Sequence, residues 1–207
     1  MKPTRALVPI SLLAAWLLLG GCATAPGIPD TTYFRLPPPG VEFAPVAQPL
    51  SQPVVVDTLL ADGLHSDQAL IYSLDPDASR LKAYHYQLWV DPPVRMLQRR
   101  LISALRSAEI APIVADRLPV QVQAIRVEGR LERFERVRVD QGWQVAVSMS
   151  LRADVRDGKP PLLLRIYSRE LPANGASVRD SVLAMGLALD QIYAEFIDDL
   201  QQAARGD

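Results

Sequence analysis

The chain has 207 residues, of which 49% are hydrophobic and 22% charged, and its formal net charge is −1. This length suits one domain with a core of its own. Because there is no basic excess to attract a polyanion, we expect no nucleic-acid partner.

The first 21 residues have the layout of a secretory signal peptide. Lys2 and Arg5 precede an apolar stretch that runs from Ala6 to Leu19. At about 1.5 Å per residue, a helix of this length spans roughly 21 Å, less than the ~30 Å hydrocarbon core of a bilayer. We therefore expect residues 1–21 to be removed rather than to remain as a transmembrane helix.

Cys22 is the only cysteine and follows Leu19-Gly20-Gly21. This ending resembles the lipobox of bacterial lipoproteins, which implies a diacylglyceryl group on the sulfur and an N-acyl group such as palmitate. Three acyl chains hold a protein firmly at a bilayer. Ala23, rather than Asp, implies by the same resemblance the outer membrane of a Gram-negative bacterium, facing the periplasm. The alternative is a free or buried cysteine.

Removing 21 of the 207 residues leaves 186, with 20 basic and 23 acidic side chains and a net charge of −3. No thiol would then remain for a disulfide. Residues 22–52 are the predicted tether, because eight of the 18 prolines lie between residues 26 and 53 and favour extended chain. Within it, residues 33–36 predict a short strand that adds to a sheet edge, the alternative being a solvated linker.

Residues 53–204 predict a single α+β domain, with a mostly antiparallel or mixed β-sheet and two main amphipathic helices packed on it. Three strands are expected first, over 54–59, 69–74 and 81–90. Asp91 is the candidate N-cap of the first helix, which begins with Pro92-Pro93.

The second half of the domain has clear periodicity. Alternating apolar and polar residues from Trp143 to Val155 predict a strand with one buried face, and Asp157-Gly158 predicts a hairpin into a strand over 161–169. In the preceding strand the apolar positions change faces, which predicts a bulge near Ala124-Ile125. Four charged residues are expected on the solvated face of that strand, a binding role being the alternative: Arg126, Glu128, Arg130 and Glu132.

A long helix is predicted from about Ser177 to Gln202, opened by a relative of the capping box formed by Ser177 and Asp180. Its apolar stripe is expected to pack on the sheet, with Gly186 allowing close approach. A partner helix or coiled coil is the alternative. The stripe consists of Val182, Gly186, Leu189, Tyr193, Phe196 and Leu200.

Catalytic and metal-binding patterns are missing from the sequence. His65 and His85 lie twenty residues apart without metal-ligand spacing, and there is no phosphate-binding loop or nucleophile elbow. The acidic pairs at 75–77 and 198–199 fall in predicted turns or helix ends, where solvated carboxylates are common. We expect no enzyme activity, no metal and no cofactor beyond the covalent acyl groups.

Three segments follow one another along the chain: Tyr33 to Pro37 (Tyr-x-x-Leu-Pro), Leu60 to Gly63 followed by Tyr72, and Leu88-Trp89-x-x-Pro92 before the first helix. With the lipobox, they resemble the auxiliary lipoproteins of ABC-type transport systems. That family contains the paraquat-inducible lipoprotein, encoded beside proteins with mammalian-cell-entry (MCE) domains. Val90-Asp91 departs from the small residues common before the prolines.

The resemblance implies a non-catalytic docking subunit of a lipid transport system, with an ABC permease and ATPase in the inner membrane and MCE proteins as the conduit. A homo-oligomer is compatible with ring-shaped partners. The candidate partner contacts are Tyr33, Phe34, Leu36 and Trp89, although Trp89 is equally well explained as a core aromatic. Two alternatives are an assembly lipoprotein of an outer-membrane β-barrel translocon and a direct periplasmic lipid-binding protein.

Overall fold

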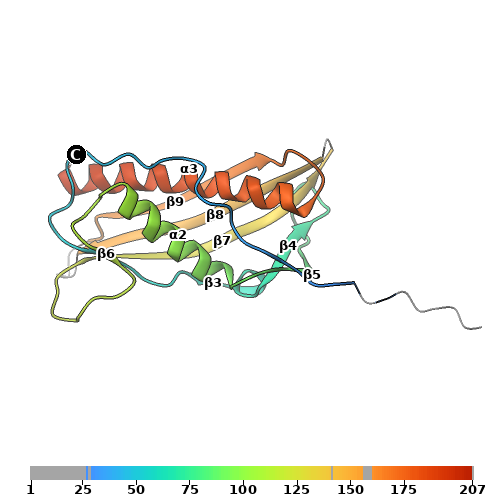
Figure 1. The fold of residues 1–207 in the computed structure, drawn as a ribbon. Coiled ribbons are helices and arrows are strands. Elements are labelled where there is room, and N and C mark those ends of the chain that lie inside the picture. Colours follow the sequence, from blue (N-terminus) through green and yellow to red (C-terminus); the bar gives the residue numbers. More distant parts are fainter. Residues whose placement is uncertain (1–26, 28, 141, 156–159, 207) are drawn as a thin grey trace, which may run out of the picture. The chain divides into compact units, whose positions relative to one another are not determined.

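The computed structural model describes residues 27, 29–140, 142–155 and 160–206. The predicted signal peptide, Cys22 and the predicted Asp157-Gly158 hairpin lie outside these described residues. Residues from Thr31 onward form one compact unit, built from a curled mixed sheet and two long helices (Figure 1). The predicted α+β class is confirmed.

Strand β7 (Ile125–Val139) organises the sheet. On one side it pairs antiparallel with β8 (Gly142–Val155), which pairs antiparallel with β9 (Leu163–Pro172). On its other side three short strands lie parallel to it in succession: β2 (Val54–Val56), β3 (Leu60–Ala61) and β4 (Ala69–Ser73). Beyond them lie β5 (Lys82–Trp89), antiparallel to β4, then β1 (Thr32–Phe34), parallel to β5, and β6 (Val114–Ala115), parallel to β2.

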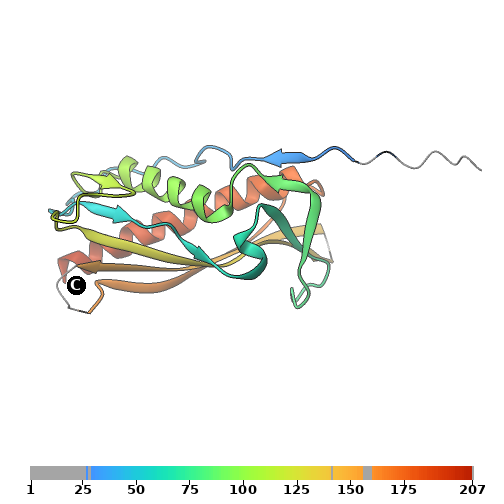
Figure 2. The same cartoon turned by 90° about the horizontal axis from the view of Figure 1, so that it is seen from below.

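The helices α2 (Pro93–Ser107) and α3 (Val178–Arg205) cover the same face of the sheet (Figure 2). Ser177 caps α3 as predicted, because its hydroxyl accepts the amide of Asp180 at 3.1 Å while the Asp180 carboxylate accepts the amide of Ser177. The N-cap of α2 is Pro92, so the prediction of Asp91 was wrong by one residue.

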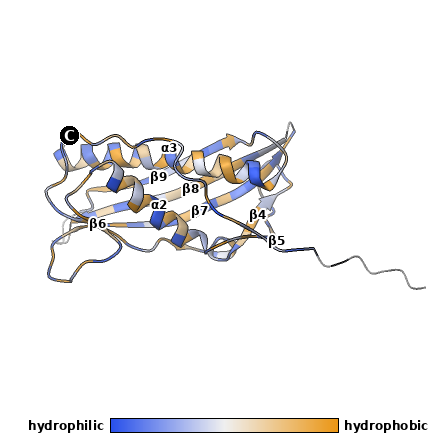
Figure 3. Cartoon of the chain, in the orientation of Figure 1, coloured by the Kyte–Doolittle hydropathy of each residue, from blue (hydrophilic) through white to orange (hydrophobic). Residues whose placement is uncertain are grey.

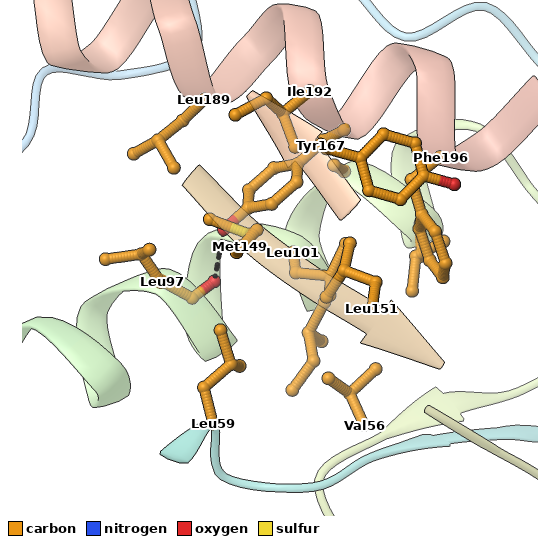
Figure 4. Close-up of a cluster of buried hydrophobic side chains, with 14 of the residues drawn as sticks. Val56, Leu59, Leu97, Leu101, Met149, Leu151, Tyr167, Leu189, Ile192 and Phe196 are labelled. Carbon is orange, nitrogen blue, oxygen red and sulfur yellow. Dashed lines mark hydrogen bonds between the residues drawn. The ribbon is translucent and has the colours of Figure 1, made fainter. Parts of the chain in front are cut away.

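The core lies between the helices and the inward side chains of β8, which alternate as predicted. Figure 4 shows Leu189, Ile192 and Phe196 of α3 facing Met149 and Leu151 of β8. The Tyr193 hydroxyl donates to the carbonyl of Leu97 at 3.1 Å and so joins the two helices inside this core. A short 3₁₀ helix, η1 (Gly63–Ser66), follows β3.

The bulge predicted near Ala124-Ile125 was wrong. The β7–β8 ladder runs without a shift from Ile125 to Leu131 and shifts between Leu131 and Arg133, so Glu132 is the extra residue. This single insertion exchanges the faces of β7: Leu131 points to the core before it and Phe134 after it. The four charged side chains predicted on the solvated face are exposed.

Gly129 is a packing position. A Cβ there would lie 2.8 Å from Cδ2 of Leu151 and 3.2 Å from Cγ of Leu59. The absence of a side chain therefore lets β8 and the segment after β2 close on β7.

A polar cluster holds η1 against β7. The Glu135 carboxylate contacts Nε2 of His65 at 3.1 Å and Nε of Arg133 at 2.7 Å, and accepts the amide of Phe134 at 2.8 Å. Burial acts to raise the pKa of Glu135, but the hydrogen bonds from His65 and Arg133 outweigh it and hold the pKa below its ordinary value of 4.5.

The lowered pKa of Glu135 predicts acid sensitivity. Its contribution to the free energy of unfolding is present above pH 4.5 and is lost as the pH falls through the lower, folded-state pKa. Urea titrations of Glu135→Gln should therefore show a shallower loss of stability below pH 4.5 than the parent. The exposed Glu128→Gln should keep the parent slope, and equal slopes for all three proteins would contradict this assignment.

Candidate docking surface

The segment before β2 lies on the folded body. β1 pairs with β5 in register Phe34↔Trp89, and the carbonyl of Phe34 accepts the amide of Val90 at 3.0 Å. From β1 the chain crosses the helix layer (Figure 1, blue) and reaches β2. We call residues 35–53 the strap. β1 is the short edge strand predicted at residues 33–36, and the alternative of a solvated linker there was wrong.

The strap passes α3 at a glycine. A Cβ on Gly186 would lie 2.6 Å from Cγ of Pro37, well inside van der Waals contact. Gly186 therefore permits the close approach that the sequence predicted, and the group that approaches is the strap.

A buried ion pair fixes the same point. Arg100 of α2 contacts Oδ1 of Asp190 on α3 through Nε at 3.0 Å and Nη2 at 2.6 Å, and their side chains are 7% and 1% exposed. The strap completes the pair: the carbonyl of Pro37 accepts Nη1 of Arg100 at 2.6 Å, and the amide of Gly40 donates to Oδ2 of Asp190 at 2.7 Å.

Burying these charges is tolerable because their hydrogen-bonding groups find partners. Several kcal/mol are lost for each ion that leaves water, and only good geometry with further hydrogen bonds offsets that loss. Nη2 of Arg100 also points to the carbonyl of Gly186 at 3.4 Å. The helix pair and the strap are thus joined by one network.

The rest of the strap runs along the end of α2 and the segment that follows it. The amide of Val46 donates to the carbonyl of Ala108 at 2.9 Å, and the amide of Leu50 to that of Ile110 at 2.7 Å. Phe43 and Leu50 are buried in the main core.

An open groove of about 980 Å³ lies between the strap and the N-terminal half of α2. We call it the strap groove. Its lining combines apolar residues with charged residues of both signs, and includes Arg35, Leu36, Val90, Asp91, Met96 and Arg99. A concave surface of this kind suits an extended or helical segment of a partner.

The predicted contact residues divide between surface and core. Tyr33 is 59% exposed, while Phe34 and Leu36 are half-buried, Leu36 in the wall of the strap groove. Trp89 is 1% exposed and stacks on Phe134 with ring centroids 5.2 Å apart. It is a core aromatic in this structure and is not available to a partner.

Sequence reasoning did not single out Arg100 or Asp190. The available signal was a charged residue on the apolar stripe of each helix: Arg100 three residues after Leu97, and Asp190 four residues after Gly186. Such a residue on the packing side of a helix calls for a buried partner.

Among the described residues, no group of His, Cys, Asp and Glu side chains gathers as a metal site would require. His85 is exposed on β5, and His65 belongs to the Glu135 cluster. Within the same residues no helix has the length and hydropathy of a membrane span.

The fold and the strap define the class: a mixed-sheet α+β domain whose helix pair is bridged by its own N-terminal segment. The sequence pattern of the family described as ABC-type transport auxiliary lipoprotein component matches residues 34–196. The chain belongs to this family of lipoproteins that assist ABC-type transporters.

Several solved structures share the fold. Protein XCC0632 from Xanthomonas campestris has a TM-score of 0.69 at 18% identity, over 84% of this chain and 99% of that chain. An uncharacterized protein has a TM-score of 0.67 at 16% identity, over 82% of this chain and 98% of that chain. The hypothetical protein CT253 from Chlamydia trachomatis has a TM-score of 0.52 at 10% identity, over 76% of this chain and 100% of that chain. A comparison with curated proteins gave no match.

The ion pair predicts strong coupling between α2 and α3. Asp190→Leu or Arg100→Met leaves one buried charge unpaired and should lower the free energy of unfolding by about 3 kcal/mol each. The double variant Arg100→Met/Asp190→Leu should lose less than the sum of the two, by about 2 kcal/mol, in urea titrations. The exposed pair Arg99–Asp91 is the matched control, with losses below about 1 kcal/mol. Strict additivity at Arg100 and Asp190 would refute the coupling.

The close contact at Gly186 reverses the change in stability that helix propensity alone predicts for Gly186→Ala. In a free helix, Gly→Ala stabilises by about 1 kcal/mol. Because of Pro37, Gly186→Ala should instead destabilise by about 1 kcal/mol, as overpacking does. Adding Pro37→Ala should recover most of the loss in thermal or urea unfolding. A more stable Gly186→Ala protein would show that the strap does not pack there.

Proposed function

We propose that this protein is a non-catalytic docking subunit of an ABC-type, MCE-associated lipid transport system. In this proposal it is anchored to the periplasmic side of the outer membrane through acyl groups on Cys22. The observation that carries the proposal is family membership over residues 34–196, together with a groove that the strap holds open on the folded body.

The anchor and the groove are close in the chain. From Cys22 to Arg35, the first residue of the strap, is 13 residues, which reach at most about 45 Å when fully extended. A lipidated Cys22 would therefore keep the start of the strap within this distance of the bilayer. An MCE protein, or a part of the permease–ATPase complex that reaches the periplasm, would dock there, with Tyr33, Phe34 and Leu36 as candidate contacts. Assembly of several copies belongs to the same proposal and would appear as the mass of the crosslinked complex.

The test is recovery of partners from intact bacteria. Crosslinked envelopes should yield transporter or MCE subunits with a C-terminally tagged full chain, and the chain should take up labelled palmitate and fractionate with the outer membrane. Cys22→Ala should remove the label and the membrane fractionation without changing the folded domain. A chain that recovers no transporter or MCE subunit would overturn the docking role.

Other results would select the alternatives. Recovery of an outer-membrane β-barrel instead would point to a translocon assembly lipoprotein. A non-covalent lipid extracted from the purified chain in stoichiometric amount would point to a lipid carrier. Hydrolytic activity lost on replacing one carboxylate or histidine would point to an enzyme.

A further inference from the structure

Helix α2 has four arginines and no acidic residue, in a chain whose net charge is −1. Arg100 turns inward to Asp190. At about 100° per residue, Arg95, Arg99 and Arg106 lie within about 40° of one another around the helix axis, over a length of about 16 Å. All three are exposed. We call these three residues the arginine row. Figure 3 shows hydrophilic stretches between hydrophobic ones along α2.

Acidic neighbours compensate little of this charge. Asp91 pairs with Arg99 at 2.5 Å. Arg106 donates Nε to a backbone carbonyl, so its charge stays uncompensated, and Arg95 forms no ion pair with another described residue. Glu109, beyond the end of α2, is exposed and is likewise not paired with the row. The row is therefore available to an anionic partner.

One member of the arginine row, Arg99, lines the strap groove together with its partner Asp91, while Arg95 and Arg106 lie outside the lining of the groove. Arg99 lines one side of the groove and Arg35 the other, and Arg35 is exposed without an ion pair among the described residues. Between them, Leu36 is half-buried and Met96 is buried, so the apolar atoms are recessed. A bilayer surface is met by apolar groups that protrude, whereas a recessed apolar floor with cationic rims fits a polypeptide segment.

We propose that the arginine row and the strap groove bind an acidic segment with intervening apolar residues on the transporter or MCE subunit to which this protein docks. The inference rests on the proposed docking function and names the chemistry of its contact. Opposite charges across such an interface accelerate association and fix its orientation, while the apolar floor contributes burial.

The experiment maps the contact in living cells with the full chain. A photo-crosslinking amino acid is placed at Ser103, which is exposed and lines the groove between Arg99 and Arg106. A control is placed at Ile166, which is 62% exposed on the opposite face of the sheet. Crosslinked peptides are then identified by mass spectrometry. We expect Ser103 to capture a transporter or MCE segment with a clear excess of Asp and Glu over Lys and Arg.

The outcomes separate this inference from the proposed function. If Ser103 captures a neutral or basic segment of a transporter or MCE subunit, the acidic contact is wrong and docking stands. The same holds if Ser103 captures only lipid, or nothing, while Ile166 captures a transporter subunit. If neither position captures a transporter or MCE subunit, both the inference and the docking role fail.

Charge variants supply the second measurement. Arg95→Gln/Arg99→Gln/Arg106→Gln should lower the Ser103 crosslink yield about fivefold or more, because three exposed attractions are lost. The matched variant Arg126→Gln/Arg130→Gln/Arg152→Gln removes the same charge from the opposite face and should leave the yield nearly unchanged. An equal loss in both variants, with both folded by circular dichroism, would overturn a specific role for the row.

Discussion

The buried ion pair between Arg100 and Asp190 determines where the N-terminal segment of this protein lies. Charges leave water at a cost of several kcal/mol each, so they persist in a core only where hydrogen bonds satisfy them. Here two of those bonds come from the backbone of the strap, at Pro37 and Gly40. The strap completes the pair and the pair fixes the strap. This mutual dependence fixes the strap beside α2 at Pro37 and Gly40, while the ladder with β5 holds β1 at the sheet edge.

This arrangement gives a proline-rich segment a structural role. Prolines lack the amide proton that a neighbouring strand would bind, so residues 37–39 are poor sheet partners but suitable walls for a groove. The same segment leads toward the predicted lipid anchor. In the proposed docking arrangement, a partner in the groove meets a part of the domain that lies close in sequence to the proposed lipid anchor.

The sequence was informative where structure is locally encoded. The alternation of β8 and the capping box of α3 depend on residues two to three positions apart, and both were predicted correctly. The bulge was misplaced because the switch of faces at Glu132 depends on the register with β8, which no local pattern reveals. Arg100 and Asp190 are 90 residues apart, so their pairing is set by how the helices pack. The predicted contact residue Trp89 lies in the core, where it stacks on Phe134, a neighbour 45 residues away in the sequence.

Through this ion pair the strap belongs to the cooperative fold of the domain. Hydrogen exchange at the amide of Gly40, which donates to the buried carboxylate of Asp190, measures that membership. We expect protection comparable to that of amides in the middle of α3, with exchange only on global unfolding. Exchange at the rate of an unstructured peptide, while the β8 amides stay protected, would contradict it.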